Sequence, residues 1–247
     1  MQRVVNAVIW VAIAIVVTLG IFYVAAVWLV TAPFDRARYH AGRAFRHLAV
    51  ASVKLNPLWH FEIEGQGPAD PRRPYVAVSN HESYADIFLI SHFPWEMKWL
   101  SKDAIFKIPI MGWMMRMAGD VPIKRGNRDS VLAALAECRD RLKKRVSVMI
   151  FPEGTRAPTG DLLPFKDGAF KLAIETGSPI LPIAVAGTRQ CMAKHSFRFQ
   201  RARAKARVLP PIMTEGMTAE DLPVLKAKTR AVIETARHEL QQSLRVS

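Results

Sequence analysis

A histidine and an aspartate near position 80 have the types and spacing that proton transfer requires. His81 and Asp86 lie five positions apart, directly after the apolar run Tyr75-Val76-Ala77-Val78. Because five positions do not bring two side chains to one face of a regular helix, His81 should lie on a loop and Asp86 in the first turn of the next helix. The carboxylate could then accept a hydrogen bond from one ring nitrogen and leave the other free as a base.

A second segment, Phe151-Pro152-Glu153-Gly154-Thr155-Arg156, combines a carboxylate and a guanidinium around a glycine. Gly154 predicts a tight turn, since glycine adopts conformations that other residues resist. Arg156 offers a fork of donors that matches phosphate oxygens. Glu153 is a poor phosphate ligand, so we expect it to orient Arg156 or to bond a substrate hydroxyl. Taken alone, the segment is equally consistent with a surface turn held by an ion pair.

Two further segments are uninformative alone. Lys124 and Arg125 end an apolar stretch, at the position where open α/β sheets bind ligands, but a solvated strand end explains them equally well. Pro182 interrupts the apolar stretch 179–183, which is consistent with core or with the wall of a site.

Other chemistries fit the sequence less well. His81-Glu82 begins like a zinc protease motif, but Ala85 occupies the position of the second histidine, so no metal site is predicted. No Gly-x-Ser-x-Gly motif occurs, which disfavours a serine hydrolase, and helix capping is the expected role of Ser83. The two cysteines, Cys138 and Cys191, are far apart, which disfavours a disulfide framework and fits a reducing compartment.

These residues need a scaffold, and from Leu58 onward short apolar stretches alternate with helical patterns. Such strands are typical of a sheet covered on both faces, so we predict an α/β fold with a mixed, largely parallel sheet flanked by helices. Asn127 or Asp129 should cap one helix and Thr218 the last. The expected strands are 59–64, 75–79, 97–101, 120–124, 146–151, 180–186 and 205–209, and the expected helices are 84–92, 109–118, 128–144, 168–176 and 219–243.

An N-terminal membrane-binding helical segment should precede this domain. Residues 4–31 contain no charged side chain and are long enough to cross a bilayer. A signal peptide is the alternative, but the apolar region is too long and no cleavage site follows it. A basic helix over 34–55 should follow, either along the headgroups or packed on the domain. The arginines after residue 31 place the remaining chain on the cytoplasmic side of the inner membrane.

The charge balance narrows the partners. The formal net charge is +14, which points to a polyanion: nucleic acid, an anionic bilayer or phosphorylated substrates. The basic clusters at 141–145 and 198–207 have few aromatic residues among them, and no nucleic-acid motif is present. We therefore favour an anionic bilayer surface and phosphorylated substrates, with no nucleic acid, and keep a nucleic-acid-binding membrane protein as an alternative.

Together, these segments resemble the glycerolipid acyltransferase family, especially bacterial 1-acyl-glycerol-3-phosphate acyltransferases, over roughly residues 58–210. The family motif Asn-His-x4-Asp corresponds to Asn80, His81 and Asp86, and its second segment ends at Arg125. Its motif Phe-Pro-Glu-Gly-Thr-Arg is matched residue for residue at 151–156, and its proline-bearing strand at Pro182. The chain departs from the family's usual residues at Ala157 and at 103–104, and these departures leave the choice of acceptor open.

We therefore expect membrane-anchoring helices at 1–57, from the apolar and basic segments there, and an α/β acyltransferase domain at 58–247. The resemblance implies a base, His81, oriented by Asp86, acting on a free glycerol hydroxyl, with acyl-CoA or acyl carrier protein as donor and phosphatidic acid as product. Other lysolipid acceptors, such as a lyso-ornithine lipid, and a catalytically silent scaffold remain as alternatives. The expected substrate-binding residues are Lys124, Arg125, Glu153, Gly154, Thr155, Arg156 and Lys166, with Pro182 as acyl-donor contact or wall.

Overall fold

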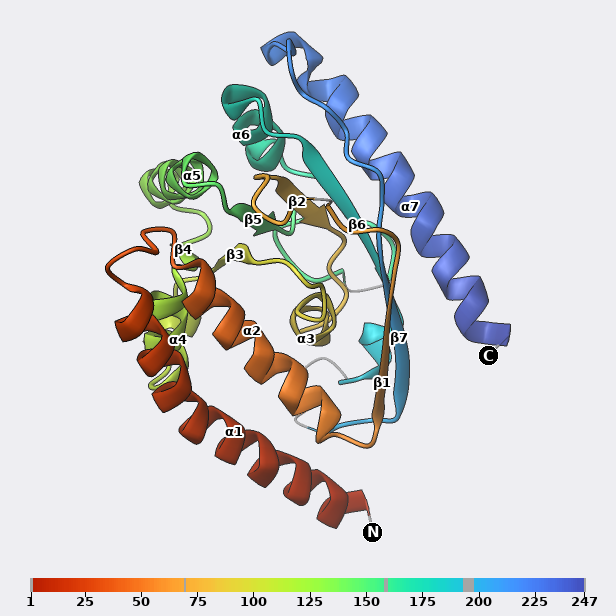
Figure 1. Ribbon diagram of the computed structural model, residues 1–247. Helices are drawn as coiled ribbons and strands as arrows, with labels where there is room; N and C mark the ends of the chain where they lie inside the picture. Colours follow the sequence, from red (N-terminus) through yellow and green to blue (C-terminus); the bar gives the residue numbers. More distant parts are fainter. Residues whose placement is uncertain (1, 69, 158–159, 193–197, 247) are drawn as a thin grey trace.

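The computed structural model describes residues 2–68, 70–157, 160–192 and 198–246, and its centre is a seven-stranded sheet (Figure 1). The strand order is β1-β7-β6-β2-β5-β3-β4, and every pair is parallel except β6 with β7. The predicted mixed, largely parallel sheet is therefore confirmed. The strands are β1 (Trp59–Glu64), β2 (Val76–Ser79), β3 (Met97–Lys102), β4 (Val121–Ile123), β5 (Ser147–Ile150), β6 (Ile180–Ala186) and β7 (Ala202–Val208).

Helices cover both faces of the sheet because the central strands are apolar on both sides. Val76 and Val78 face a core built with α5, α6 and α7, whereas Tyr75 and Ala77 face a core built with α3. The helices are α1 (Gln2–Thr31), α2 (Tyr39–Lys54), α3 (Ala85–Ile90), α4 (Met111–Ala118), α5 (Arg128–Lys143), α6 (Gly168–Thr176) and α7 (Leu222–Val246). Short 3₁₀ turns are η1 (Ile105–Lys107), η2 (Thr188–Gln190) and η3 (Ala219–Asp221).

Several ends differ from the sequence-based expectation. Strand β7 begins at Ala202, because alanines alternating with charged residues bury one face of the strand while it pairs with β1. Helix α2 begins at Tyr39, after a turn in which the Asp35 carboxylate accepts the backbone N–H of His40 at 2.8 Å. The expected caps are confirmed at Asn127, which accepts from Ser130 N, and at Thr218.

The N-terminal helix α1 lies along the domain. It packs against α2 and α4, and near its start the Asn6 side chain accepts the backbone N–H of Phe199 at 2.6 Å (Figure 1). The Trp10 and Phe199 ring centroids are 5.0 Å apart. Helix α1 is therefore fixed to the α/β domain by contacts near both of its ends.

Candidate active site

The position of His81 is set by its backbone neighbours at the carboxyl ends of β2, β5 and β6. Asn80 exchanges two hydrogen bonds with the backbone of Val185 in β6, at 2.9 and 2.8 Å. The His81 N–H donates to Glu153 Oε1 at 2.7 Å, and the His81 carbonyl accepts from Ala157 N at 2.9 Å. Two motifs about 70 residues apart are thus joined through the main chain of one histidine.

The His81 ring is held in one orientation. Its Nδ1 lies 2.7 Å from Asp86 Oδ2, and because a carboxylate only accepts, Nδ1 carries the proton. The ring stacks on Phe151 with centroids 4.0 Å apart. Nε2 has no hydrogen-bond partner within the described part of the chain. With 9 % of its side chain exposed, the histidine is largely buried, and Nε2 is its remaining nitrogen.

Asp86 is buried and surrounded by donors. Its Oδ2 also accepts the N–H groups of Glu82 and Ser83 at 2.8 and 3.0 Å, and its Oδ1 accepts the hydroxyl of Thr188 in η2. Besides His81, three donors therefore hold the Asp86 carboxylate in the orientation that positions the imidazole. The structure therefore brings His81 and Asp86 together as predicted, on a loop and in the first turn of α3.

Glu153 has a different place from the one expected. It is buried, and its oxygens accept the backbone N–H groups of His81 and Leu163, the second at 2.9 Å. The pKa of Glu153 is raised, because the effect of burial outweighs that of these two hydrogen bonds, which lower it. The prediction that Glu153 orients Arg156 is wrong, because a turn that ends a buried strand leaves its carboxylate to satisfy loop N–H groups. Both Glu153 oxygens are thus hydrogen-bonded to loop backbone N–H groups.

The turn at Gly154 requires glycine. Its φ is +71°, and a Cβ at this position would lie 2.8 Å from Lys166 Nζ. The backbone of Lys166 is tied to the same turn, since its N–H donates to the Pro152 carbonyl at 2.9 Å. Lys166 therefore lies over the turn, and Gly154 serves the close approach of its ammonium.

Two arginines come together beside the histidine loop. The Arg156 guanidinium lies over the Tyr84 ring, 4.0 Å from its centroid, three residues after His81. The pKa of Arg125 is lowered, first by partial burial and also by the nearby charge of Arg156, although Tyr84 raises it. Neither arginine forms an ion pair with a described carboxylate. Two neighbouring cations that lack a counter-ion among the described residues are the arrangement that an anion would require.

The remaining predicted residues are less closely involved. Lys124 is exposed at the end of β4, with its N–H donating to Ser130 Oγ at 2.9 Å, and Thr155 is exposed on the turn. Pro182 is buried within β6, paired with Val78 of β2, where it is a wall of the core.

Residues that sequence reasoning missed complete the site. Thr188 and Tyr84 carry no motif of their own, although Thr188 follows a strand end. Arg237 of α7 donates to Glu82 Oε1 at 3.1 Å and also to the Gly160 carbonyl, so the last helix ties two loops of the site together. A charged residue on the buried face of an amphipathic helix is the signal that could have indicated Arg237.

Glu82 gives the site a titratable group near neutrality. Burial and the charge of Asp86 raise the pKa of Glu82 to about 7, although Arg237 lowers it. A carboxyl whose pKa rises on folding stabilises the folded state below its unfolded pKa, and this stability is lost as the pH rises through about 7.

We expect Glu82→Gln to remove this dependence. Relative to wild type, the free energy of unfolding of the variant should rise by up to about 3 kcal/mol between pH 5 and pH 8. Denaturant unfolding in detergent micelles measures it, with the exposed Glu215→Gln as the matched control. A difference that stayed constant with pH would show that Glu82 ionises in its ordinary range.

The chain is similar to known acyltransferases. The acyltransferase family model matches residues 60–186. The chain is 41% identical over 163 residues to a chloroplastic 1-acyl-sn-glycerol-3-phosphate acyltransferase of Brassica napus, covering 64% of this chain and 46% of that protein. It is 34% identical over 181 residues to 1-acyl-sn-glycerol-3-phosphate acyltransferase alpha of Homo sapiens, covering 72% and 64%.

The fold also matches a solved structure along its length. The crystal structure of the 1-acyl-sn-glycerophosphate acyltransferase from Thermotoga maritima aligns with a TM-score of 0.79 and 27% sequence identity, covering 98% of both chains. By contrast, the chain spans about half the length of the plant relative that it matches.

Proposed function

Since this chain belongs to the acyltransferase family, we propose that it transfers a fatty acyl group from an acyl thioester to the free hydroxyl of 1-acyl-glycerol-3-phosphate, giving phosphatidic acid. The observation that carries the proposal is the His81–Asp86 pair beside Arg125 and Arg156. Among the described residues, Nε2 of His81 has no hydrogen-bond partner and the two arginines have no carboxylate partner. A base next to an anion site suits a hydroxyl acceptor that carries phosphate.

In this mechanism, His81 acts as the general base. Nε2 takes the proton of the acceptor hydroxyl while its oxygen attacks the thioester carbonyl. The tetrahedral intermediate then collapses, the C–S bond breaks, and the thiolate leaves with the proton that the imidazolium returns. Asp86 keeps Nδ1 protonated and stabilises the imidazolium, as in other histidine–carboxylate pairs.

The acceptor phosphate binds at the two arginines. Arg125 and Arg156 supply charge-assisted donors, and Tyr84 holds the Arg156 guanidinium in place before substrate arrives. Lys166 adds a third cation over the Gly154 turn. A bound phosphate would place the free hydroxyl of a short glycerol unit within reach of His81 on the adjacent loop.

The same turn offers donors for the developing oxyanion. Gly154 N–H is engaged by the Phe151 carbonyl at 3.0 Å. The N–H groups of Thr155 and Arg156 have no acceptor among the described residues, so we assign the oxyanion to them. Removing one such donor from an oxyanion site typically raises the activation free energy by about 2.7–4 kcal/mol.

A panel of acceptors tests this function. Purified protein is given one acyl-CoA or acyl carrier protein donor and either 1-acyl-glycerol-3-phosphate, other lysophospholipids, a lyso-ornithine lipid or monoacylglycerol. The proposal expects the phosphorylated monoester to be used best, and monoacylglycerol far more slowly because it leaves both arginines unpaired. Preference for the lyso-ornithine lipid would assign the chain to that acceptor instead.

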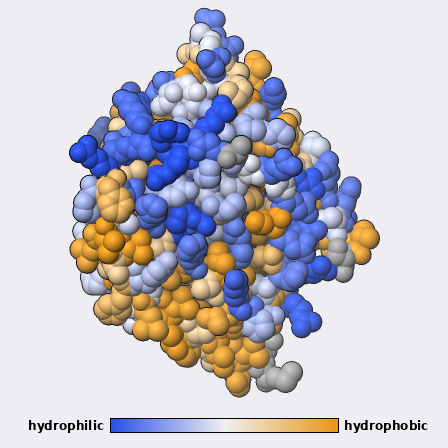
Figure 2. Space-filling model, in the orientation of Figure 1, coloured by the Kyte–Doolittle hydropathy of each residue, from blue (hydrophilic) through white to orange (hydrophobic). Residues whose placement is uncertain are grey.

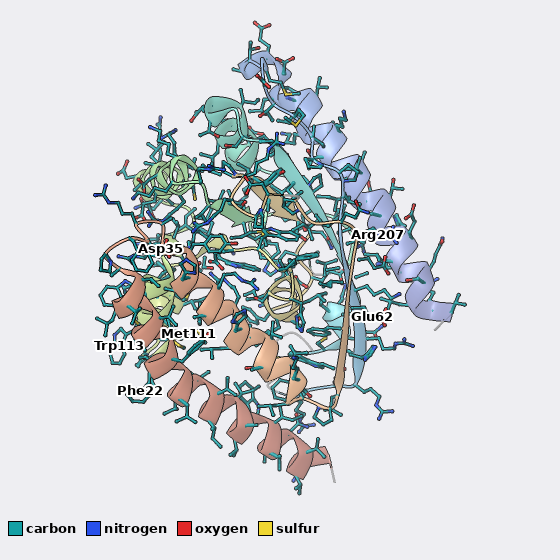
Figure 3. All side chains as sticks on the ribbon, in the orientation of Figure 1. Phe22, Asp35, Glu62, Met111, Trp113 and Arg207 are labelled. Carbon is teal, nitrogen blue, oxygen red and sulfur yellow. The ribbon has the colours of Figure 1, made fainter. Side chains whose placement is uncertain are left out.

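We also propose that the protein lies on the cytoplasmic face of the inner membrane, with α1 and α4 immersed. Helix α1 is long and apolar enough to cross a bilayer. Apolar side chains gather on the side of the molecule where α1 and α4 lie (Figure 2). Phe22, 71% exposed, and Trp113, 57% exposed, lie together there with Met111 (Figure 3). Exposed aromatics at this density are typical of a membrane interface.

Since α1 packs along α2 and α4, we expect it to lie within one leaflet with both ends on the cytoplasmic side. A cysteine replacing Gln2, probed in intact cells with an impermeant thiol reagent, should stay unlabelled until lysis. Labelling from outside would mean that α1 spans the bilayer. Cys138 and Cys191 are replaced first so that the introduced cysteine is the one probed. Both are buried, which raises the pKa of their thiols, so their replacement should not change the background labelling.

A further inference from the structure

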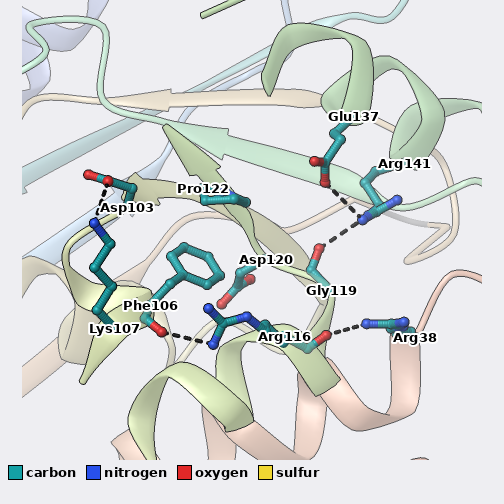
Figure 4. Close-up of a pocket in the computed structure, with 10 residues that line it drawn as sticks. All are labelled: Arg38, Asp103, Phe106, Lys107, Arg116, Gly119, Asp120, Pro122, Glu137 and Arg141. Carbon is teal, nitrogen blue, oxygen red and sulfur yellow. Dashed lines mark hydrogen bonds and ion pairs between the residues drawn. The ribbon is translucent and has the colours of Figure 1, made fainter. Parts of the chain in front are cut away.

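A polar pocket lies apart from the His81 site, between α4, α5 and the free edge of β4 (Figure 4). Its volume is about 470 Å³, the size of a small ligand site. Phe106 and Pro122 form its apolar part, and four cationic side chains line it with three acidic ones. The cations are Arg38, Lys107, Arg116 and Arg141, and the acids are Asp103, Asp120 and Glu137.

The three acids are already neutralised. Lys107 pairs with Asp103 at 3.4 Å and Arg141 with Glu137 at 3.4 Å (Figure 4). Asp120 pairs with Arg46, which is buried behind the pocket. Arg38 and Arg116 form no ion pair with a described carboxylate, so the pocket wall carries two uncompensated positive charges.

Both unpaired arginines are held in place. Arg116 donates through Nη1 to the Phe106 carbonyl at 2.8 Å, and Arg38 donates through Nη1 to the Arg116 carbonyl (Figure 4). Arg38 has φ +54°, a left-handed conformation, and buried Lys98 donates to its carbonyl at 2.7 Å. Each guanidinium keeps most of its five N–H donors available after these bonds. Burial and the charge of Arg141 lower the pKa of Arg38, as expected for crowded cations.

The pocket is close to the apolar face. Arg38 follows the turn that carries Phe34, which is 70% exposed, and Arg116 is three residues beyond Trp113 on α4. If these aromatics lie at the membrane interface, the two arginines lie at the depth of the phospholipid phosphates. The acceptor-binding arginines, Arg125 and Arg156, are not among the pocket's lining residues.

We propose that the pocket of Arg38 and Arg116 binds the phosphate of an anionic phospholipid headgroup, separately from the acceptor site. Two fixed guanidiniums supply the charge-assisted hydrogen bonds that a phosphate accepts, and bound lipid would fix the angle at which the domain meets the bilayer. The inference depends on the proposed membrane orientation and not on acyl transfer.

Vesicle flotation of the full-length protein tests it. The vesicles are phosphatidylcholine with or without phosphatidylglycerol, in about 1 M salt, where the Debye length of about 3 Å removes diffuse attraction. Wild type should still prefer phosphatidylglycerol vesicles. Arg38→Gln with Arg116→Gln, which keeps side-chain N–H donors for the two carbonyls, should lose that preference about tenfold or more.

Controls separate the possible outcomes. Arg36→Ala with Lys54→Ala removes two exposed cations outside the pocket and should keep the preference. Equal loss in both double variants, or no preference in wild type, overturns the lipid site. Abolition of the preference by millimolar inorganic phosphate would identify a free-phosphate site and also overturn it. Failure of wild type to float with either vesicle would overturn both the membrane orientation and the lipid site that depends on it, independently of activity.

Discussion

His81→Ala is expected to lower kcat for acyl transfer by about 10²–10⁴, the usual contribution of a positioned base. The reason is specific to the ring: Nδ1 is committed to Asp86, so Nε2 is the nitrogen that can accept the hydroxyl proton. The backbone of His81 makes its two hydrogen bonds whatever the side chain, so the variant should fold and bind vesicles normally.

The measurement is initial-rate acyl transfer with saturating donor, together with vesicle flotation to show an intact fold. His60→Ala, an exposed histidine on β1, is the matched control and should retain wild-type activity. Turnover by His81→Ala above about a hundredth of wild type would contradict the general-base role.

The double variant Arg125→Ala with Arg156→Ala is expected to lower kcat/KM for 1-acyl-glycerol-3-phosphate by about 10²–10⁴. Each charge-assisted hydrogen bond contributes roughly 1.5–3 kcal/mol, and a tenfold change corresponds to about 1.4 kcal/mol. Use of the thioester donor should change little, because these cations face the acceptor phosphate. Monoacylglycerol, which lacks the phosphate, should be used about as well by the variant as by wild type.

Kinetics with both acceptors separate this effect from general damage. Lys228→Ala removes an exposed cation from α7 and should leave both acceptors unaffected. A parallel fall for both acceptors in the double variant would mean that the arginines support the fold. Unchanged kinetics with the phosphorylated acceptor would move the phosphate site elsewhere.

The sequence predicts best the strands and helices whose ends are determined by the pattern of neighbouring residues. Strands β1 and β6 have the predicted bounds. β1 alternates apolar and polar residues and β6 is a continuous apolar run, and both patterns can be seen within a few residues. Strand β7 was placed too late, since its buried residues are alanines whose small apolar surface is easily missed between arginines and lysines. The start of α2 depends on a turn closed by Asp35, a contact that no periodicity reveals.

At the site, the limit of sequence reasoning was distance along the chain. His81 and Asp86 could be paired because one loop and one helical turn join them. Thr188 reaches Asp86 from η2, just after β6, and Arg237 reaches Glu82 from the last helix. Only the folded sheet brings these residues together. The pairing of Glu153 with backbone N–H groups is of the same kind, which is why a role toward Arg156 was wrongly expected.

The most direct test of the account is the ratio of products in a single reaction. Purified protein is mixed with 1-acyl-glycerol-3-phosphate and an acyl thioester, and phosphatidic acid and free thiol are quantified at the same time points. Base-assisted attack by the acceptor hydroxyl predicts one phosphatidic acid for each thiol released, with both products lost together in His81→Ala. Thiol release without phosphatidic acid, at a rate independent of the acceptor, would mean that water is the nucleophile and would contradict the proposed acyl transfer.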